Sequence, residues 1–230
     1  MPEMSVRTVL ERGPKGKRVV AFALDWPGWS RGAKTPEEAL ATLESYRQRY
    51  RRVATRARMT KEFDEAGPLE VIEDRVGTGS TDFWGISFSP CSLEQGQMED
   101  HEFTRKVKLL RSSWSYFDDV AARVSPEMRK GIRGGGRERD EIIRHTRGTE
   151  IELFAKKVGV RVPEGTALSD ETLLAYREDY VAALREHHKG RTSLRTWTLP
   201  FLIRHSAFHV MDHAWEMEDK DLSGTTAKKR

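Results

Sequence analysis

The stretch Arg204-His-Ser-Ala-Phe-His-Val-Met-Asp-His-Ala-Trp-Glu-Met-Glu-Asp219 places a histidine at every fourth position, at 205, 209 and 213. On an α-helix a step of four residues advances by about 400°, so the three imidazoles form a slowly drifting row along one side. The apolar residues of the same segment recur at helical spacing and define its inward side. They are Leu202, Ile203, Ala207, Val210, Ala214 and Met217.

Two of these histidines are predicted to face inward. On the helical wheel His209 and His213 fall on the apolar side, whereas His205 falls further round, near Asp212 and Glu216, on the polar side. Two inward histidines one turn apart form a chelating pair, because a divalent ion needs neutral imidazoles on one face. The alternative is an ordinary helix whose histidines are partly buried and hydrogen-bonded.

The composition predicts a protein without a membrane span. Apolar residues make up 37% of the 230 positions and charged residues 33%. No run of about 18 apolar residues is present, and the first residues lack the basic-then-apolar layout of a signal peptide. Cys91 is the single cysteine, which excludes an internal disulfide framework and favours a cytoplasmic location. Packing or a loop position is favoured for this residue over a nucleophilic role.

The charge distribution does not favour a nucleic-acid partner. The formal net charge is +4, but 36 acidic residues are mixed among 40 basic ones. The densest basic run, Arg47–Arg58, spreads its arginines over one side of a predicted helix and gathers its apolar residues on the other. This pattern is typical of a solvated helix face, and nucleic-acid binding through it is the less favoured interpretation.

The N-terminal part reads as a small sheet with one helix. Val6–Leu10 and Arg18–Leu24 are predicted strands, and the second is apolar on both faces, as expected for an inner strand of a covered sheet. Leu69–Val76 is a further predicted strand, and Thr81–Phe88 a weaker one. This α+β domain is predicted to span residues 1–92.

A resemblance supports that outline. Thr35 is a predicted helix N-cap, followed by Pro36 at the first helical position. A strand followed by Asp25-Trp-Pro-Gly28 and then by Gly32-Ala-Lys-Thr-Pro-Glu-Glu-Ala-Leu40 resembles the β-β-α-β domain of HicB-like antitoxins over residues 5–75. HicB antitoxins carry a DNA-binding segment after this domain, and the sequence shows none, so the resemblance does not imply a repressor.

From about Asp100 the pattern becomes helical. Helices are predicted at about 100–124, from about Arg137 to Val158, from Ser169 to Lys189, and from Pro200 onward. Four helices with two longer connections predict an all-α four-helix bundle over residues 93–220. The polar tail 221–230 is predicted to be disordered.

The second half resembles the DinB superfamily. The resemblance rests on Gly134-Gly-Gly-Arg-Glu-Arg-Asp140, on Ile142-Ile-Arg-His145, and on His209-Val-Met-Asp-His213-Ala-Trp-Glu-Met-Glu-Asp219. DinB-like proteins are metal-binding four-helix bundles, and some are thiol-dependent transferases or isomerases. The resemblance implies that His145, His209 and His213 are the metal ligands.

Such a site predicts a metal-dependent enzyme. Three neutral ligands leave coordination positions for water or substrate, with zinc as the first expectation and nickel or iron as alternatives. The predicted reaction is thiol-linked transfer or hydrolysis of a small molecule, with a low-molecular-weight thiol as a candidate cosubstrate. A non-catalytic binding or regulatory module with a HicB-like interaction domain is the alternative. A homodimer and a monomer both remain open.

Two charged features accompany the predicted ligands. Arg133 and Arg137 flank the glycine run Gly134–Gly136 ahead of a predicted helix, and they are candidate contacts for an anionic substrate. A flexible connector with solvated arginines is the alternative. Glu150, just beyond His145, is a candidate proton-transfer or supporting group, with an outward salt bridge as the commoner outcome.

Overall fold

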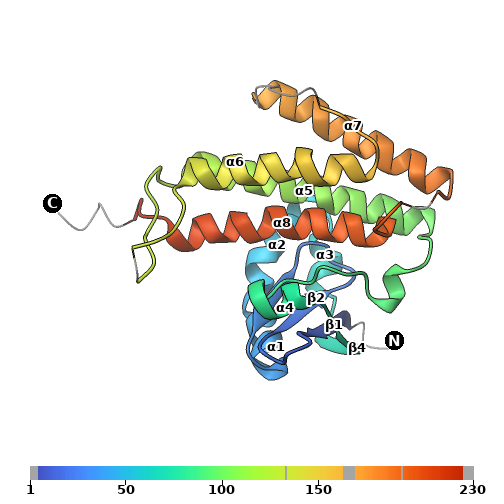
Figure 1. Cartoon of the computed structure of the whole chain (residues 1–230), viewed down its shortest axis with the longest axis horizontal. Helices are drawn as coiled ribbons and strands as arrows, with labels where there is room; N and C mark the ends of the chain where they lie inside the picture. Colours follow the sequence, from blue (N-terminus) through green and yellow to red (C-terminus); the bar gives the residue numbers. More distant parts are fainter. Residues whose placement is uncertain (1–4, 133, 163–168, 193, 225–230) are drawn as a thin grey trace.

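The fold combines a four-stranded sheet with a set of long helices (Figure 1). The structure is a computed structural model that describes residues 5–132, 134–162, 169–192 and 194–224. All its strands come before the long helices along the chain, so the predicted mixed α+β class is confirmed.

The sheet is built from β1 (Val6–Arg12), β2 (Val19–Ala23), β3 (Ser30–Ala33) and β4 (Leu69–Val76). Their order is β3-β2-β1-β4, with β2 antiparallel to both neighbours and β4 parallel to β1. All five residues of β2 are buried. The prediction that this strand lies inside a covered sheet is therefore confirmed.

The side chains on the two faces of the sheet belong to different hydrophobic clusters. Leu10 and Ala21 lie opposite each other in the ladder and belong to the main hydrophobic core. Val9 and Phe22 are the neighbouring pair on the other face. That face forms a separate small cluster of Val9, Val20, Phe22, Leu24 and Cys91. The guanidinium carbon of Arg204 lies 3.8 Å from the centre of the Phe22 ring, so a buried cation covers this second face.

Three helices connect β3 to β4: α1 (Pro36–Ser45), α2 (Arg47–Arg56) and α3 (Thr60–Asp64). The predicted N-cap is confirmed, because the Thr35 side chain accepts a hydrogen bond from the backbone N–H of Glu38 at 3.2 Å. The segment between β2 and β4 is longer than a β-β-α-β pattern implies, since it contains a third strand, β3, and two additional helices.

The prediction of a strand at Thr81–Phe88 is wrong. The chain forms the short helix α4 (Gly79–Trp84), an extended segment and the 3₁₀ turn η1 (Ser92–Glu94). Local signals explain the helix: the Thr78 side chain caps its first turn, and Gly85 ends it with a left-handed φ of 71°. These end signals favour a helical turn over the predicted strand.

The long helices are α5 (Asp100–Arg123), α6 (Arg139–Thr149), α7 (Asp170–Lys189) and α8 (Leu199–Lys220), and α6 continues as the π-helix η2 (Glu150–Ala155). The four helical segments predicted in this half are confirmed, although the second begins at Arg139. α5 and α8 run in one direction and α6 and α7 in the other, with α7 on the outer side (Figure 1). By length and hydropathy together, no helix in the described part of the chain qualifies as a membrane span.

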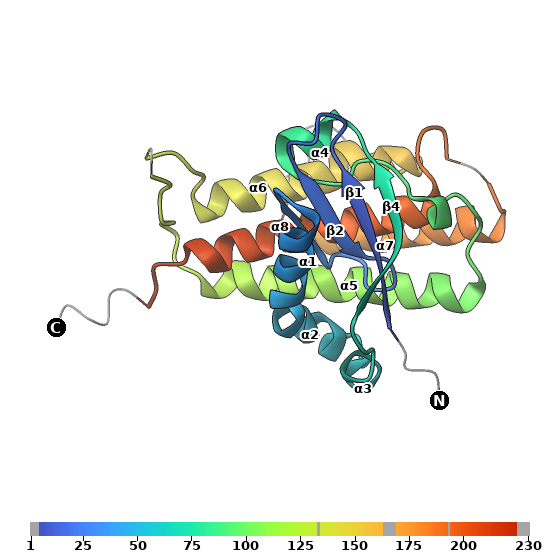
Figure 2. The same ribbon diagram turned by 90° about the horizontal axis from the view of Figure 1, so that it is seen from below.

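The helices lie across the sheet (Figure 2), and the two parts share one core. A single hydrophobic cluster contains residues from the sheet, α2, α5 and α8, among them Leu10, Tyr50, Phe117 and Trp215. Gly28, with φ of 96°, permits the close approach: a Cβ there would lie 2.9 Å from the Met211 Cγ. The boundary near residues 92–100 stays a prediction, and the packing across it is continuous.

Ion pairs also connect α2 to the long helices α5 and α8. Arg49 of α2 donates to Glu218 and Asp219 of α8, each at 2.7 Å, and Arg56 pairs with Asp119 of α5. All the arginines of α2 have carboxylate partners; they are Arg47, Arg49, Arg51, Arg52 and Arg56. The basic run is therefore largely neutralised within the molecule, which removes the main argument for a nucleic-acid surface.

The first residue of the segment predicted to be disordered, Asp221, is held by contacts with the rest of the molecule. Asp221 accepts hydrogen bonds from the backbone N–H of Ser125 at 2.9 Å and from its hydroxyl at 3.1 Å. This residue also pairs with Met128 in an isolated β-bridge. The chain is thus anchored to the end of α5 just after α8, and residues 225–230 lie outside the described part.

Candidate metal centre

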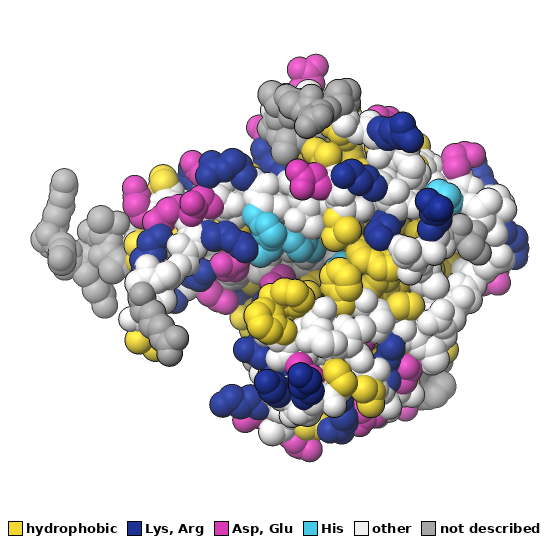
Figure 3. All heavy atoms as spheres, in the orientation of Figure 1, with side chains coloured by type: hydrophobic (Ala, Val, Ile, Leu, Met, Phe, Trp, Pro, Cys, Tyr) yellow, Lys and Arg dark blue, Asp and Glu magenta, His cyan; other side chains and the backbone are white. Residues whose placement is uncertain are grey.

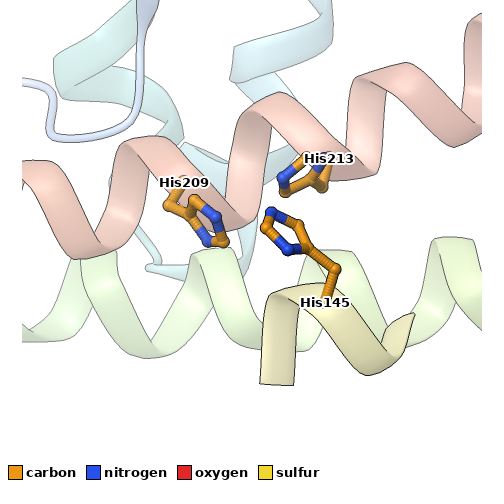
Figure 4. A group of neighbouring side chains, drawn as sticks. All are labelled: His145, His209 and His213. Carbon is orange, nitrogen blue, oxygen red and sulfur yellow. The ribbon is translucent and has the colours of Figure 1, made fainter. Parts of the chain in front are cut away.

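The structure brings together the three histidines expected to bind metal (Figure 4). His209 and His213 lie one turn apart on α8, and His145 faces them from α6. The ring centres are 4.7 Å apart within the pair, and His145 lies 5.3 Å and 4.9 Å from its two neighbours. The packing of α6 against α8 thus brings His145 next to two histidines that lie 64 and 68 positions later in the sequence.

The spacing of the nitrogens fits a metal site that contracts on binding. One nitrogen from each ring lies within 4.8 Å of the others. Around a tetrahedral ion with bonds of about 2.0–2.1 Å, ligand nitrogens are roughly 3.3–3.4 Å apart, so the rings must approach by up to about 1.4 Å. Rotation about the side-chain bonds of His145, which is exposed, can supply much of this movement.

The environment keeps two of these imidazoles neutral. Burial, followed by the nearby charge of His213, lowers the pKa of both His145 and His209, and for His209 the value is about 2. The Nδ1 atom of His209 is buried and has no hydrogen-bond partner among the described residues. A neutral, unpartnered imidazole nitrogen is suited to binding a cation, and coordination would remove the cost of leaving it unsatisfied.

The sequence analysis missed the group that orients His213. The Nδ1 atom of His213 is 2.8 Å from Oε2 of Glu216, and the other carboxylate oxygen accepts a hydrogen bond from Lys220 at 2.6 Å. Hydrogen bonding to His213, together with Lys220, lowers the pKa of Glu216 to about 2. With Nδ1 occupied, Nε2 of His213 remains available as a ligand. The spacing i, i+3 and i, i+4 on one helix is the signal that could have revealed this chain of contacts.

The placement of His205 on a polar helix side was wrong. This side chain is only 3% exposed and is surrounded by the rings of Phe88, Phe154, Trp197 and Phe201. Burial lowers its pKa to about 3. A wheel of one helix cannot show that another segment covers its polar side. As expected, His205 is not part of the cluster of three.

The predicted anion contacts are only partly described. Arg133 lies outside the described residues. After burial and His213, the charge of Arg137 also contributes to lowering the pKa of His145, which places this arginine in the electrostatic range of the cluster. The glycine run does not directly precede the helix. α6 starts at Arg139, and Glu138 caps its first turn, so a carboxylate already occupies the N-terminal end.

Glu150 does not join the histidines. It is buried, and its two carboxylate oxygens each accept a hydrogen bond from Arg177 of α7 at 3.0 Å. Burial raises its pKa in spite of this partner. The predicted salt bridge is therefore present, but it points inward and links η2 to α7.

Cys91 is an unsuitable nucleophile, as the sequence predicted. Its side chain is fully buried within the cluster on the second sheet face. Burial and the neighbouring Glu94 carboxylate raise the pKa of the thiol to about 11. At neutral pH it is protonated and shielded from solvent.

The histidine cluster is open to solvent. In the space-filling view the histidines are visible at the surface, between side chains of α6 and α8 (Figure 3). His145 is exposed, and His209 and His213 are half-buried. Small molecules can therefore approach the cluster from the side of His145.

Comparison of the chain with protein-family models, with curated proteins and with solved structures finds no match.

Proposed function

We propose that the chain binds one divalent metal ion through His145, His209 and His213 and acts as a metal-dependent enzyme on a small molecule. The observation that carries the proposal is the convergence of these three imidazoles from two helices at a solvent-accessible face. Thiol-linked transfer or hydrolysis is the proposed reaction, with zinc as the first candidate metal and nickel or iron as alternatives.

The protein's residues prepare part of the ligand set before a metal binds. Glu216 holds the His213 ring by its Nδ1 atom, and burial keeps His209 unprotonated. A bound divalent ion would lower the pKa of a coordinated water or of a low-molecular-weight thiol. The three-residue ligand set leaves positions for such a group on the exposed side.

One observation favours a non-catalytic binding module as the second candidate. Among the described residues, Glu216 is the one carboxylate hydrogen-bonded to these histidines, and both its oxygens are engaged by His213 and Lys220. A free general base is therefore not evident beside the cluster. In this second candidate function the metal stabilises a surface that binds a ligand without catalysing a reaction.

We also propose the two family relationships and a cytoplasmic location for the chain. The single histidine on the second long helix and the pair on the last one agree with the DinB-like resemblance of residues 93–220. The sheet and α1 agree in outline with the HicB-like resemblance of the first part. The single, buried Cys91 fits the proposed cytoplasmic location.

Elemental analysis tests the metal site. The full chain, purified without a histidine tag and dialysed against zinc, is expected to retain about one equivalent per chain, whereas His209→Ala retains less than about a tenth of that. His187→Ala is the matched control, because this histidine lies on α7 and bonds Thr192. Absence of retained metal in the unmodified chain would overturn the proposal.

A further inference from the structure

Helix α4 presents two large aromatic side chains to solvent. Phe83 is 72% exposed and Trp84 is 61% exposed. Their rings contact each other edge to face, with centres 4.9 Å apart and planes at 80°. Adjacent, exposed rings of this size are uncommon on a monomer and mark a surface that binds something.

The short helix is held in place by buried polar groups. Thr81 donates to the fully buried Glu11 carboxylate at 2.7 Å. Asp82 accepts backbone hydrogen bonds from Lys15 and Lys17 of the β1–β2 hairpin, at 2.7 Å and 2.8 Å. The residues before the aromatic pair are thus fixed to the sheet, and the two rings are held outward without a packing role of their own.

The pair lies at the edge of the histidine cluster. In the space-filling view, hydrophobic side chains gather over α4 directly beside the histidines (Figure 3). A cavity of about 150 Å³ lies between Trp84 and α8, where Phe208 and Asp212 form its wall. These two residues directly precede His209 and His213 in the sequence, so the cavity and the cluster lie on adjacent sides of the same stretch of α8, about 100° apart round the helix.

We propose that Phe83 and Trp84 bind the flat apolar part of the substrate of the histidine centre. This inference rests on the proposed function. The substrate class is a small molecule in which an aromatic or other planar group is joined by a short linker to a donor that coordinates the metal. The rings supply the apolar contact, and the three imidazoles leave the position for the donor.

A pair of hydroxamates tests this assignment on the zinc-loaded full chain. Acetohydroxamate carries the metal-binding group alone, and a hydroxamate with a naphthyl group on a two-carbon linker adds the planar part. Calorimetry is expected to show the naphthyl compound binding at least about tenfold more tightly. That ratio should fall toward one in Phe83→Ala and in Trp84→Ala, with the affinity for zinc unchanged.

Leu174→Ala is the matched control, because Leu174 is 63% exposed on α7, and it should keep the full ratio. If zinc and acetohydroxamate bind but the naphthyl advantage is absent, or persists in both aromatic variants, the inference fails while the metal site stands. If zinc does not bind, the proposed function and the inference fail together. If the unmodified chain is a dimer in sedimentation and Trp84→Ala is a monomer, the rings form a self-interface and the inference is overturned.

Discussion

Glu216 connects the chemistry of the metal site to the end of α8. Its carboxylate bonds to His213 and is itself held by Lys220, so the orientation of one proposed ligand depends on two residues that touch no metal. A carboxylate in this position also fixes the tautomer and the ring orientation of the imidazole it contacts.

The substitution Glu216→Gln is expected to weaken zinc binding by about 10–100-fold, because the amide keeps a hydrogen bond but loses the charge. Competition with a chromophoric chelator measures the change. Asp212→Asn removes the same charge from the preceding turn, where the carboxylate pairs with Arg31 at 2.8 Å, and should have a much smaller effect. Equal losses in the two variants would assign the effect to net charge alone.

His205 provides a prediction about acid stability. Its pKa is about 3 in the folded protein and near the reference value of about 6.5 in the unfolded chain. Below pH 6.5 the unfolded chain takes up a proton that the folded protein does not. Stability is therefore lost as the pH falls from about 6.5 toward 3, by up to about 1.4 kcal/mol per pH unit for this group.

The variant His205→Phe should lose the contribution of His205 to the pH dependence of the free energy of unfolding. Denaturant unfolding at pH 7, 6, 5 and 4 would show a shallower decline than in the unmodified chain, since a phenyl ring fits among the surrounding aromatic side chains without titrating. Parallel declines in the two proteins would show that His205 is not the group responsible.

The individual histidines show which contacts a sequence can reveal. His209 and His213 are neighbours because of helical geometry alone, so their pairing was readable from spacing. The approach of His145 depends on how α6 packs against α8, and no spacing within one segment encodes that; the family resemblance supplied it. The surroundings of His205 are made by residues far away in the sequence, and its environment was therefore mispredicted.

A buried ion pair links η2 to α7, beside a hydrogen bond from the Tyr176 hydroxyl to the Glu150 carbonyl oxygen. Glu150 and Arg177 are 2% and 4% exposed, and Arg177 also bonds Asp118 of α5 at 2.6 Å. The pair joins three helices in a region where solvent does not screen the charges.

Removal of one partner should be costly. Arg177→Met is expected to lower the free energy of unfolding by about 3–5 kcal/mol, because it leaves Glu150 buried and unpaired. Adding Glu150→Gln to this variant should restore part of the loss. Arg51→Ala, which breaks an exposed pair with Asp64, should have a much smaller effect. Similar losses for the buried and the exposed pair would contradict this account.

The helices and strands were readable from the sequence to different degrees. The Thr35 cap of α1 and the start of α7 at Ser169 depend on local signals and were predicted correctly. The strand assigned to residues 81–88 failed because Thr78 and Gly85 start and stop the helix α4 there. β3 was missed because its four residues become a strand only by pairing with β2.

Sheet and helices are expected to unfold together. Their shared hydrophobic cluster and the ion pairs between α2 and α8 leave neither part with a complete core of its own. Thermal unfolding followed by far-ultraviolet circular dichroism and by tryptophan fluorescence should give coincident transitions with one midpoint. Two resolved transitions, or a stable fragment of residues 1–92, would instead show independently folding domains.

The position of α8 along the chain has a consequence for synthesis. This helix provides two of the three clustered histidines, the Arg204 cation over the sheet, and the Glu218 partner of α2. A ribosome adds about 5–20 residues per second, so roughly 6–25 s separate the end of β4 from the start of α8. During that interval the second face of the sheet lacks its Arg204 cover, and the nascent chain is exposed to proteases and to chaperones until α8 is made.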